Sequence, residues 1–143
     1  MRNEMLLEVK DIRVHYDRVE AVKGISLVVP EGGIVALIGA NGAGKSTTIN
    51  ALSGVVKISS GEIWFQGKRI DKLPAEQIVA AGIAQVPEGR RLFPFMTVFE
   101  NMKIGAYHRK WNSEVANDIE ELYGHFAVLK ERRNSEGRKF EWG

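Results

Sequence analysis

The sequence contains no cysteine and no long run of apolar residues. Without thiols the chain has neither a disulfide framework nor a thiolate metal site, a composition that fits the cytoplasm. No apolar run reaches the roughly 20 residues that a membrane-spanning helix requires. The first four residues, MRNE, include an acidic residue and are not followed by an apolar core, so we expect no signal peptide here. Any membrane association is therefore expected to depend on a partner protein.

A strong excess of either charge is also missing. The net charge is +2, from 20 Lys and Arg residues against 18 Asp and Glu residues. This mixed charge, without a basic run, does not argue for binding to nucleic acid. The length of 143 residues predicts one domain. Hydrophobic residues make up 44% and charged residues 27%, which are globular values that exclude a disordered or fibrous class.

The most informative stretch is a glycine-rich motif that directly follows an apolar run. Residues 34–38, IVALI, predict a strand buried on both faces, and therefore a parallel strand. Residues 39–46 fit the P-loop pattern of a glycine, four residues and then Gly-Lys-Ser/Thr. Residues 45–53 predict a helix that ends at Gly54. The alternative is a glycine-rich turn that only caps this helix.

A triphosphate is the expected occupant of the P-loop. Its glycines let successive backbone N–H groups point inward, and the helix start adds a positive dipole end. Lys45 is expected to reach the β- and γ-phosphates, and the Ser46 hydroxyl to ligate Mg²⁺. The predicted nucleotide-binding residues of the loop are Gly39, Ala40, Asn41, Gly42, Ala43, Gly44, Lys45, Ser46 and Thr47.

Hydrophobic periodicity predicts the elements around this motif. Strands are predicted at residues 6–9, 12–16, 25–29, 62–65, 68–70 and 83–86, with a hairpin corner at Gln66-Gly67. A short helix is predicted from Pro74 at its first position to Ala81, and Gly82 is expected to stop it. Thr97 and Glu100 predict a capping box at the start of a helix that runs to about Tyr107. A last helix, from Asn112 or Ser113, is expected to present one apolar face made of Val115, Ile119, Leu122 and Phe126.

The composition changes near Met96 from strand-rich to helical. We therefore expect residues 1–96 to form a β layer with the P-loop core and residues 97–136 to begin a helical subdomain. Residues 137–143 are expected to be a frameshifted tail.

Residues 5 to about 133 resemble the N-terminal part of an ABC-transporter nucleotide-binding domain. The resemblance starts with the P-loop and the β layer before it, which carries the aromatic residue Tyr16. It implies a truncated α/β fold of the ABC type. This fold combines a P-loop NTPase core, an N-terminal antiparallel β layer and the start of a helical subdomain. In this family the aromatic residue at the Tyr16 position stacks on adenine, as a flat π-face allows. The resemblance also places Val22 among the ATP-binding residues. The alternative for Tyr16, from composition alone, is a strand residue that packs on the sheet.

Residues 86–94, VPEGRRLFP, make the chain similar to the ATP-binding subunits of branched-chain amino acid importers. ABC domains usually have a glutamine after Val-Pro that contacts Mg²⁺ and the attacking water, and Glu88 stands there in this chain. A carboxylate oxygen also ligates Mg²⁺. Gln85 lies within a predicted strand, three residues too early to substitute. The alternative interpretation of Glu88 is a solvated charge in a loop.

The resemblance also implies an interface with membrane subunits after this loop. The expected interface residues are Arg90, Arg91, Phe93, Phe95 and Met96, a mixture of basic and apolar side chains typical of interface anchors. The alternative places the aromatic residues in the core of the helical subdomain.

Several motifs of a complete ABC domain do not occur in these residues. The signature Leu-Ser-Gly-Gly, the acidic Mg²⁺ strand, the catalytic glutamate and the switch histidine are absent, so no catalytic set is complete here. Residues 137–143 match no motif of the resemblance. The genetic code permits codons for them that read Gly-Gly-Asn-Leu-Ser-Gly when the frame advances by one base, so we hypothesise a one-base insertion or deletion between about residues 134 and 137. We therefore predict a frameshifted tail, and expect the 34–38 strand to be uncovered along part of its edge.

The resemblance implies an ATP-binding component of an importer for branched-chain amino acids. Its cofactors are ATP and Mg²⁺, and its partners are membrane permease subunits and a second ATP-binding subunit in a homo- or heterodimer, without nucleic acid. Such a subunit is cytoplasmic and attached to the inner face of the membrane through the permeases. The alternatives are a nucleotide-binding fragment without turnover, an ABC ATPase of urea or amide import, and a soluble ABC ATPase of DNA repair or translation.

Overall fold

The computed structural model describes residues 5–89 and 91–139, and it divides into two compact units, Met1–Gln85 and Val86–Gly143. Each unit has a hydrophobic core of its own. Among the described residues, no helix combines the length and the apolar composition needed to cross a membrane.

The first unit is built on an antiparallel sheet with the strand order β2-β1-β3-β4. The strands are β1 (Met5–Tyr16), β2 (Val19–Pro30), β3 (Ser60–Phe65) and β4 (Lys68–Arg69). The two strands predicted at residues 6–9 and 12–16 are thus one continuous strand. Its register shifts between Val9 and Ile12, where Asp11 takes a φ of 45°. The predicted corner at Gln66-Gly67 is confirmed, because both residues have the positive φ values, 49° and 72°, that a two-residue hairpin turn requires.

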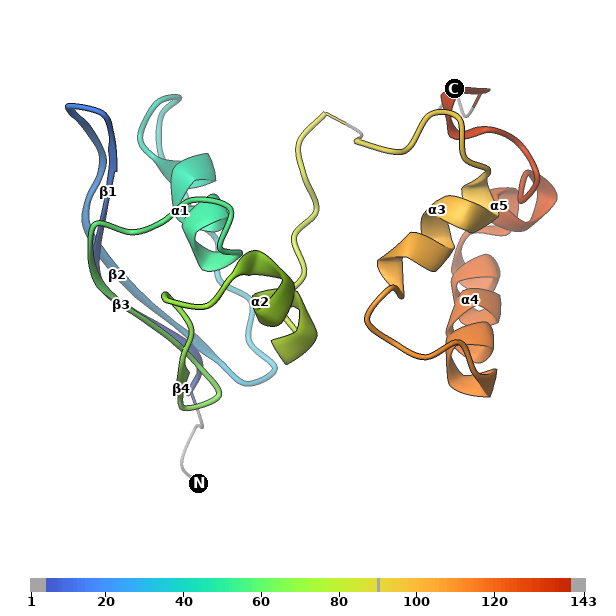
Figure 1. Cartoon of the computed structure of the whole chain (residues 1–143), viewed down its shortest axis with the longest axis horizontal. Coiled ribbons are helices and arrows are strands. Elements are labelled where there is room, and N and C mark those ends of the chain that lie inside the picture. Colours follow the sequence, from blue (N-terminus) through green and yellow to red (C-terminus); the bar gives the residue numbers. More distant parts are fainter. Residues whose placement is uncertain (1–4, 90, 140–143) are drawn as a thin grey trace. The chain divides into compact units, whose positions relative to one another are not determined.

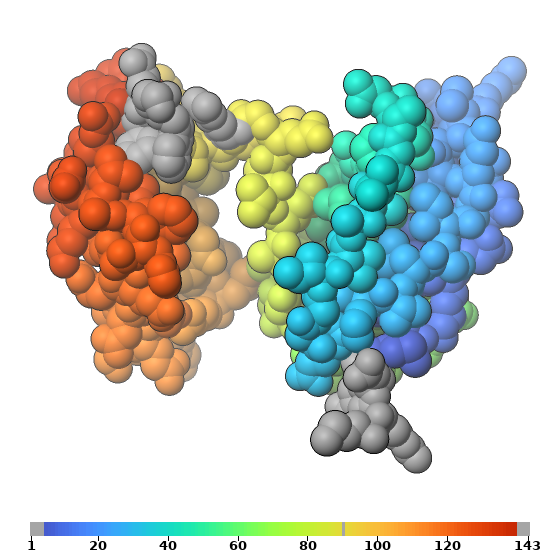
Figure 2. Space-filling model, turned by 180° about the vertical axis from the view of Figure 1, so that it is seen from behind, coloured from blue at the N-terminus to red at the C-terminus, as the bar shows by residue number. Residues whose placement is uncertain are grey.

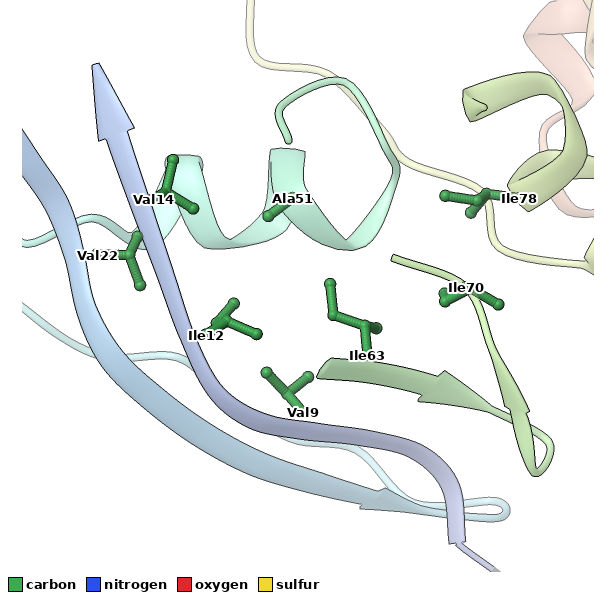
Figure 3. Close-up of a cluster of buried hydrophobic side chains, with 8 residues drawn as sticks. All are labelled: Val9, Ile12, Val14, Val22, Ala51, Ile63, Ile70 and Ile78. Atoms are coloured by element: carbon green, nitrogen blue, oxygen red, sulfur yellow. The ribbon is translucent and has the colours of Figure 1, made fainter. Parts of the chain in front are cut away.

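Two helices, α1 (Lys45–Leu52) and α2 (Ala75–Ala81), lie on one face of this sheet (Figure 1). Between sheet and helices lies a core of aliphatic side chains (Figure 3), formed by Val9, Ile12, Val14, Val22, Ala51, Ile63, Ile70 and Ile78. Both helices are followed by glycines in the left-handed region, Gly54 and Gly82, as the sequence predicts. Pro74 is the N-cap of α2 rather than its first helical residue.

The apolar runs at residues 34–38 and 83–86 do not form strands, so both predictions are wrong. Ile34, Ile38 and Val86 are 97%, 91% and 94% exposed. Figure 2 shows the segment that leads to α1 at the molecular surface (cyan). A parallel strand buried on both faces needs neighbouring strands and covering helices. The described part of the chain supplies no strand beside either run, so neither run pairs into a sheet.

The second unit is helical, with α3 (Val98–Gly105), α4 (Ser113–His125), α5 (Ala127–Glu131) and a short 3₁₀ turn, η1 (Gly137–Lys139). The predicted capping box at the start of α3 is confirmed. The Glu100 N–H donates to the Thr97 hydroxyl at 3.1 Å, and the Thr97 N–H donates to the Glu100 carboxylate at 2.8 Å. Asn112 caps α4, because its side-chain oxygen accepts the Val115 N–H at 3.1 Å.

The buried face of α4 differs from the predicted one. Val115 and Ile119 are buried as expected, but the third buried residue is Tyr123. Leu122 and Phe126, which the sequence places on this face, are 42% and 51% exposed. Residues 115, 119 and 123 follow one another at intervals of four, so they form one row along the helix. This row packs against half-buried side chains of α3 and α5, among them Phe99, Met102 and Leu129.

The contrast between buried and exposed isoleucines can be tested by unfolding. Ile63→Ala removes a fully buried side chain and is expected to lower the free energy of unfolding by about 2–5 kcal/mol. Ile34→Ala, the matched control in the exposed run, is expected to change it by less than about 0.5 kcal/mol. Urea denaturation followed by circular dichroism measures both. An equal cost for the two variants would contradict the exposure of residues 34–38.

The capping box also predicts a pH effect. The Thr97 N–H, and then the Thr97 hydroxyl, hold the pKa of Glu100 below its ordinary value. Because a lowered folded-state pKa stabilises the ionised form, the stability from this carboxylate is present above its unfolded pKa and is lost as pH falls through the folded pKa. NMR titration is expected to show a higher Glu100 pKa in Thr97→Ala and a still lowered one in Thr97→Ser. An unchanged Glu100 pKa in Thr97→Ala would contradict the contribution of the Thr97 hydroxyl, since this variant keeps the backbone N–H.

Candidate nucleotide-binding site

The P-loop is a solvent-exposed loop that ends at the first turn of α1. Gly42 and Gly44 have φ values of 84° and 88°, a region that residues with a Cβ rarely adopt. The Ala43 N–H donates to the Ala40 carbonyl at 3.1 Å and closes a turn within the loop. No side chain caps the start of α1. The loop therefore leads into a helix N-terminus that is suited to an anion.

Gly44 is also required by a close contact with β2. A Cβ at this position would lie 2.5 Å from the Ala21 carbonyl oxygen and 3.3 Å from Val22 Cγ2. Val22 itself is 1% exposed and belongs to the core. The sheet and the P-loop therefore meet at a point where only glycine fits, and this contact fixes the position of the start of α1.

Lys45 folds back across its own loop. Its ammonium donates to the carbonyl oxygens of Gly39 at 2.6 Å and Ala40 at 2.7 Å. An ammonium has three N–H donors, so two carbonyl contacts leave a third for a phosphate oxygen. The charge is thus held at the loop by two backbone groups rather than by an acidic side chain.

The remaining loop residues differ in exposure. Asn41 and Ser46 are exposed, Thr47 is half-buried, and the next residue, Thr48, is fully buried. The Thr48 hydroxyl donates to the Gly44 carbonyl at 2.9 Å, one helical turn back. This bond secures the junction between loop and helix. Sequence reasoning missed Thr48, and only its place after the Gly-Lys-Ser-Thr motif gives a signal for it.

Tyr16 is the last residue of β1 and is 47% exposed. It pairs with Val19 across the turn of the β1–β2 hairpin, and β2 continues from there to the Ala21 and Val22 contacts with Gly44. The hairpin turn and the P-loop lie at the same end of the first unit (Figure 1). The exposed aromatic ring therefore stands on the same hairpin that the phosphate loop approaches at Gly44.

Glu88 belongs to the second unit, where it lies exposed in a turn with Gly89. Gly89 has a φ of 81°, a region that residues with a Cβ rarely adopt. The described residues contain no group of three or more His, Cys, Asp and Glu side chains that could hold a metal ion. A metal role for Glu88 stays a prediction.

The expected interface segment presents apolar side chains to solvent. Phe93, Phe95 and Met96 are 53%, 77% and 37% exposed, and none of them belongs to the core of the second unit. Arg91 is also exposed, and Arg90 lies outside the described residues.

The backbone of this segment is fixed by Asn101, which sequence reasoning missed. Its side-chain oxygen accepts the Phe93 N–H at 2.9 Å, and its amide nitrogen donates to the carbonyls of Phe93 at 3.1 Å and Thr97 at 3.0 Å. The Gly137 N–H donates to the Met96 carbonyl at 2.7 Å, so η1 holds the same segment from its other end. The exposed rings thus stand on an ordered backbone.

Comparison with known proteins gives the family. A family model described as "ABC transporter" matches residues 22–141. The chain is 37% identical to the high-affinity branched-chain amino acid transport ATP-binding protein BraG of Pseudomonas aeruginosa, over 89% of this chain and 54% of that protein. It is 36% identical to the corresponding protein LivG of Salmonella typhimurium, over 75% of this chain and 42% of that protein. The chain thus spans about half the length of these curated relatives.

Solved structures agree with this result. The structure of an ATP-binding subunit of an ABC transporter superposes with a TM-score of 0.83 and 31% identity, over 95% of this chain and 56% of that one. An ATP-binding cassette bound to ADP and Pi has the same fold, with a TM-score of 0.79 at 19% identity. Since the family model covers most of the residues and the fold agrees with it, the chain belongs to the ABC transporter family.

Proposed function

We propose that this chain holds the phosphates of ATP in its P-loop and acts in the ATP-binding component of an importer for branched-chain amino acids. The observation that carries the ATP site is the geometry of residues 39–48. Two left-handed glycines, a helix start without a side-chain cap and the backbone-held Lys45 ammonium form a cradle for an anion. The identity with BraG and LivG supports the importer class.

Each P-loop residue has a separate task in this proposal. The backbone of residues 39–44 and the start of α1 surround the phosphates, and Lys45 balances the charge of the β- and γ-phosphates. The Ser46 hydroxyl is the proposed protein ligand of Mg²⁺, with Glu88 as a second oxygen ligand. When bound, Mg²⁺ neutralises phosphate charge. Val22 acts from behind the loop, through its contact with Gly44.

Tyr16 is the proposed platform for the adenine base. Its ring is about half exposed at the hairpin turn, and the adjoining strand reaches the P-loop. A flat ring of this kind stacks on a base without hydrogen bonds, so it provides affinity for the nucleoside end of the ligand.

The second unit is proposed to carry the contact with permease subunits. The exposed Phe93, Phe95 and Met96 side chains, together with Arg91, have the composition of an interface anchor. Through this contact, and through a second ATP-binding subunit, the protein would act at the inner face of the membrane.

The P-loop proposal predicts the effect of removing the Lys45 charge. Lys45→Ala is expected to weaken Mg·ATP binding by at least about tenfold, because the ammonium loses its phosphate contact. Lys68→Ala, which changes an exposed lysine of β4, is the matched control and is expected to leave the dissociation constant within about twofold. Isothermal titration calorimetry with the full 143-residue chain measures both. Equal affinities for Lys45→Ala and the unchanged chain would overturn the proposed site.

The base platform predicts a difference between two ligands. Tyr16→Ala is expected to weaken ATP binding by about fivefold to 150-fold, the range for one base stacked on an aromatic ring. The same change is expected to leave the affinity for inorganic tripolyphosphate unaltered, since that ligand has no base. Tyr16→Phe keeps the ring and is expected to bind ATP normally. A loss of affinity for both ligands in Tyr16→Ala would contradict a base-specific role.

A further inference from the structure

The first unit contains a cavity of about 560 Å³ between the loop that follows α1 and the segment that leads from β4 to α2. All of its lining residues lie between residues 54 and 74, so it shares none with the P-loop at residues 39–47. Small-molecule sites in proteins commonly have volumes of about 300–1,000 Å³. The cavity is therefore large enough for a small organic molecule, outside the candidate nucleotide site.

One wall of the cavity is fixed by the ion pair of Arg69 and Asp71. The Arg69 Nε donates to Asp71 Oδ1 at 2.9 Å, and its Nη2 donates to Oδ2 at 3.2 Å. The Asp71 side chain is only 4% exposed, and its Oδ1 also accepts the Ile63 N–H at 3.1 Å. Burial acts to raise the pKa of Asp71, but the bonds from Arg69 and Ile63 outweigh it and hold this pKa below its ordinary value. The carboxylate is thus ionised and already paired, so this wall is preformed.

Two further cations line the cavity without a partner of their own. Lys57 and Lys72 are exposed, and within the described part of the chain neither side chain makes a hydrogen bond or an ion pair. The lining contains three cations and one carboxylate, a net charge of +2. Since Arg69 and Asp71 balance each other, this excess belongs to the two lysines.

The lining also has an apolar part. Val56, Ile58 and Leu73 line the cavity and are half-buried, because they pack against the aliphatic core of the first unit. The hydrocarbon part of a ligand would cover the surface that these side chains still expose. Apolar walls with a few charged groups are typical of sites for small organic molecules.

We propose that this cavity binds a small organic phosphomonoester, with its phosphate group at Lys57 and Lys72 and its hydrocarbon part on the apolar lining. A phosphomonoester carries a charge of about −1.5 to −2 near neutral pH, which matches the two unpaired ammonium groups. Lysine binds phosphate oxygens as a point charge through short, charge-assisted hydrogen bonds. The hydroxyl of Ser60, another lining residue, is a further donor. The proposal does not depend on ATP binding at the P-loop.

NMR titration of the full 143-residue chain with n-butyl phosphate tests the site. The backbone amides of residues 54–61 and 69–74 are expected to shift and to saturate. The double variant Lys57→Ala, Lys72→Ala is expected to raise the dissociation constant at least about tenfold, because both phosphate contacts are lost. Lys68→Ala changes an exposed lysine of β4 outside the lining and is the matched control, expected to stay within about twofold. Inorganic phosphate, which has no hydrocarbon part, is expected to bind at least about fivefold more weakly.

Each contrary result overturns the proposal at a different point. Equal affinities for the double variant and the unchanged chain would show that the two lysines do not bind the phosphate. Shifts confined to residues 39–48 would place the phosphate in the P-loop and not in the cavity. Equal affinities for inorganic and butyl phosphate would remove the organic ligand class, and equal shifts with n-butanol would remove recognition of charge. A failure of ATP binding in calorimetry would overturn the nucleotide site alone.

Discussion

The structure of the first unit depends on the close approach between the P-loop backbone at Gly44 and the Ala21 carbonyl on β2. This contact sets the point where α1 begins on the face of the sheet, and the aliphatic core then fills the space behind it. A side chain at residue 44 would push the helix away from the hairpin and would also be strained at a φ of 88°. Gly44 is thus needed twice: for the close approach of α1 to the sheet, and for the left-handed backbone of the phosphate loop.

Local signals explain most of what the sequence could predict. The capping box of Thr97 and Glu100, the Gln66-Gly67 corner and the glycine ends of α1 and α2 involve residues close in sequence, and the structure has all of them. The glycine and lysine pattern of the P-loop is equally local. Here short-range hydrogen bonds and φ preferences decide the conformation, so the sequence is sufficient to predict it.

The errors concern features that depend on distant neighbours. Residues 34–38 have the composition of a buried parallel strand, but a strand exists only where another strand pairs with it, and the described residues provide none. On α4, Leu122 and Tyr123 are adjacent, and only the surface of α3 and α5 decides which of them is buried. The Gln85 amide and the Asn101 side chain likewise find partners that no local pattern announces.

The network around Asn101 has a consequence for recognition. One side chain bonds the backbone of residue 93 through both its N–H and its carbonyl, and Gly137 bonds the carbonyl of Met96. The loop beneath Phe93 and Phe95 therefore has little conformational entropy left to lose. A protein that docks on these rings would need to order only side chains, and a rigid platform of this type favours fast, specific recognition over adaptation to many partners.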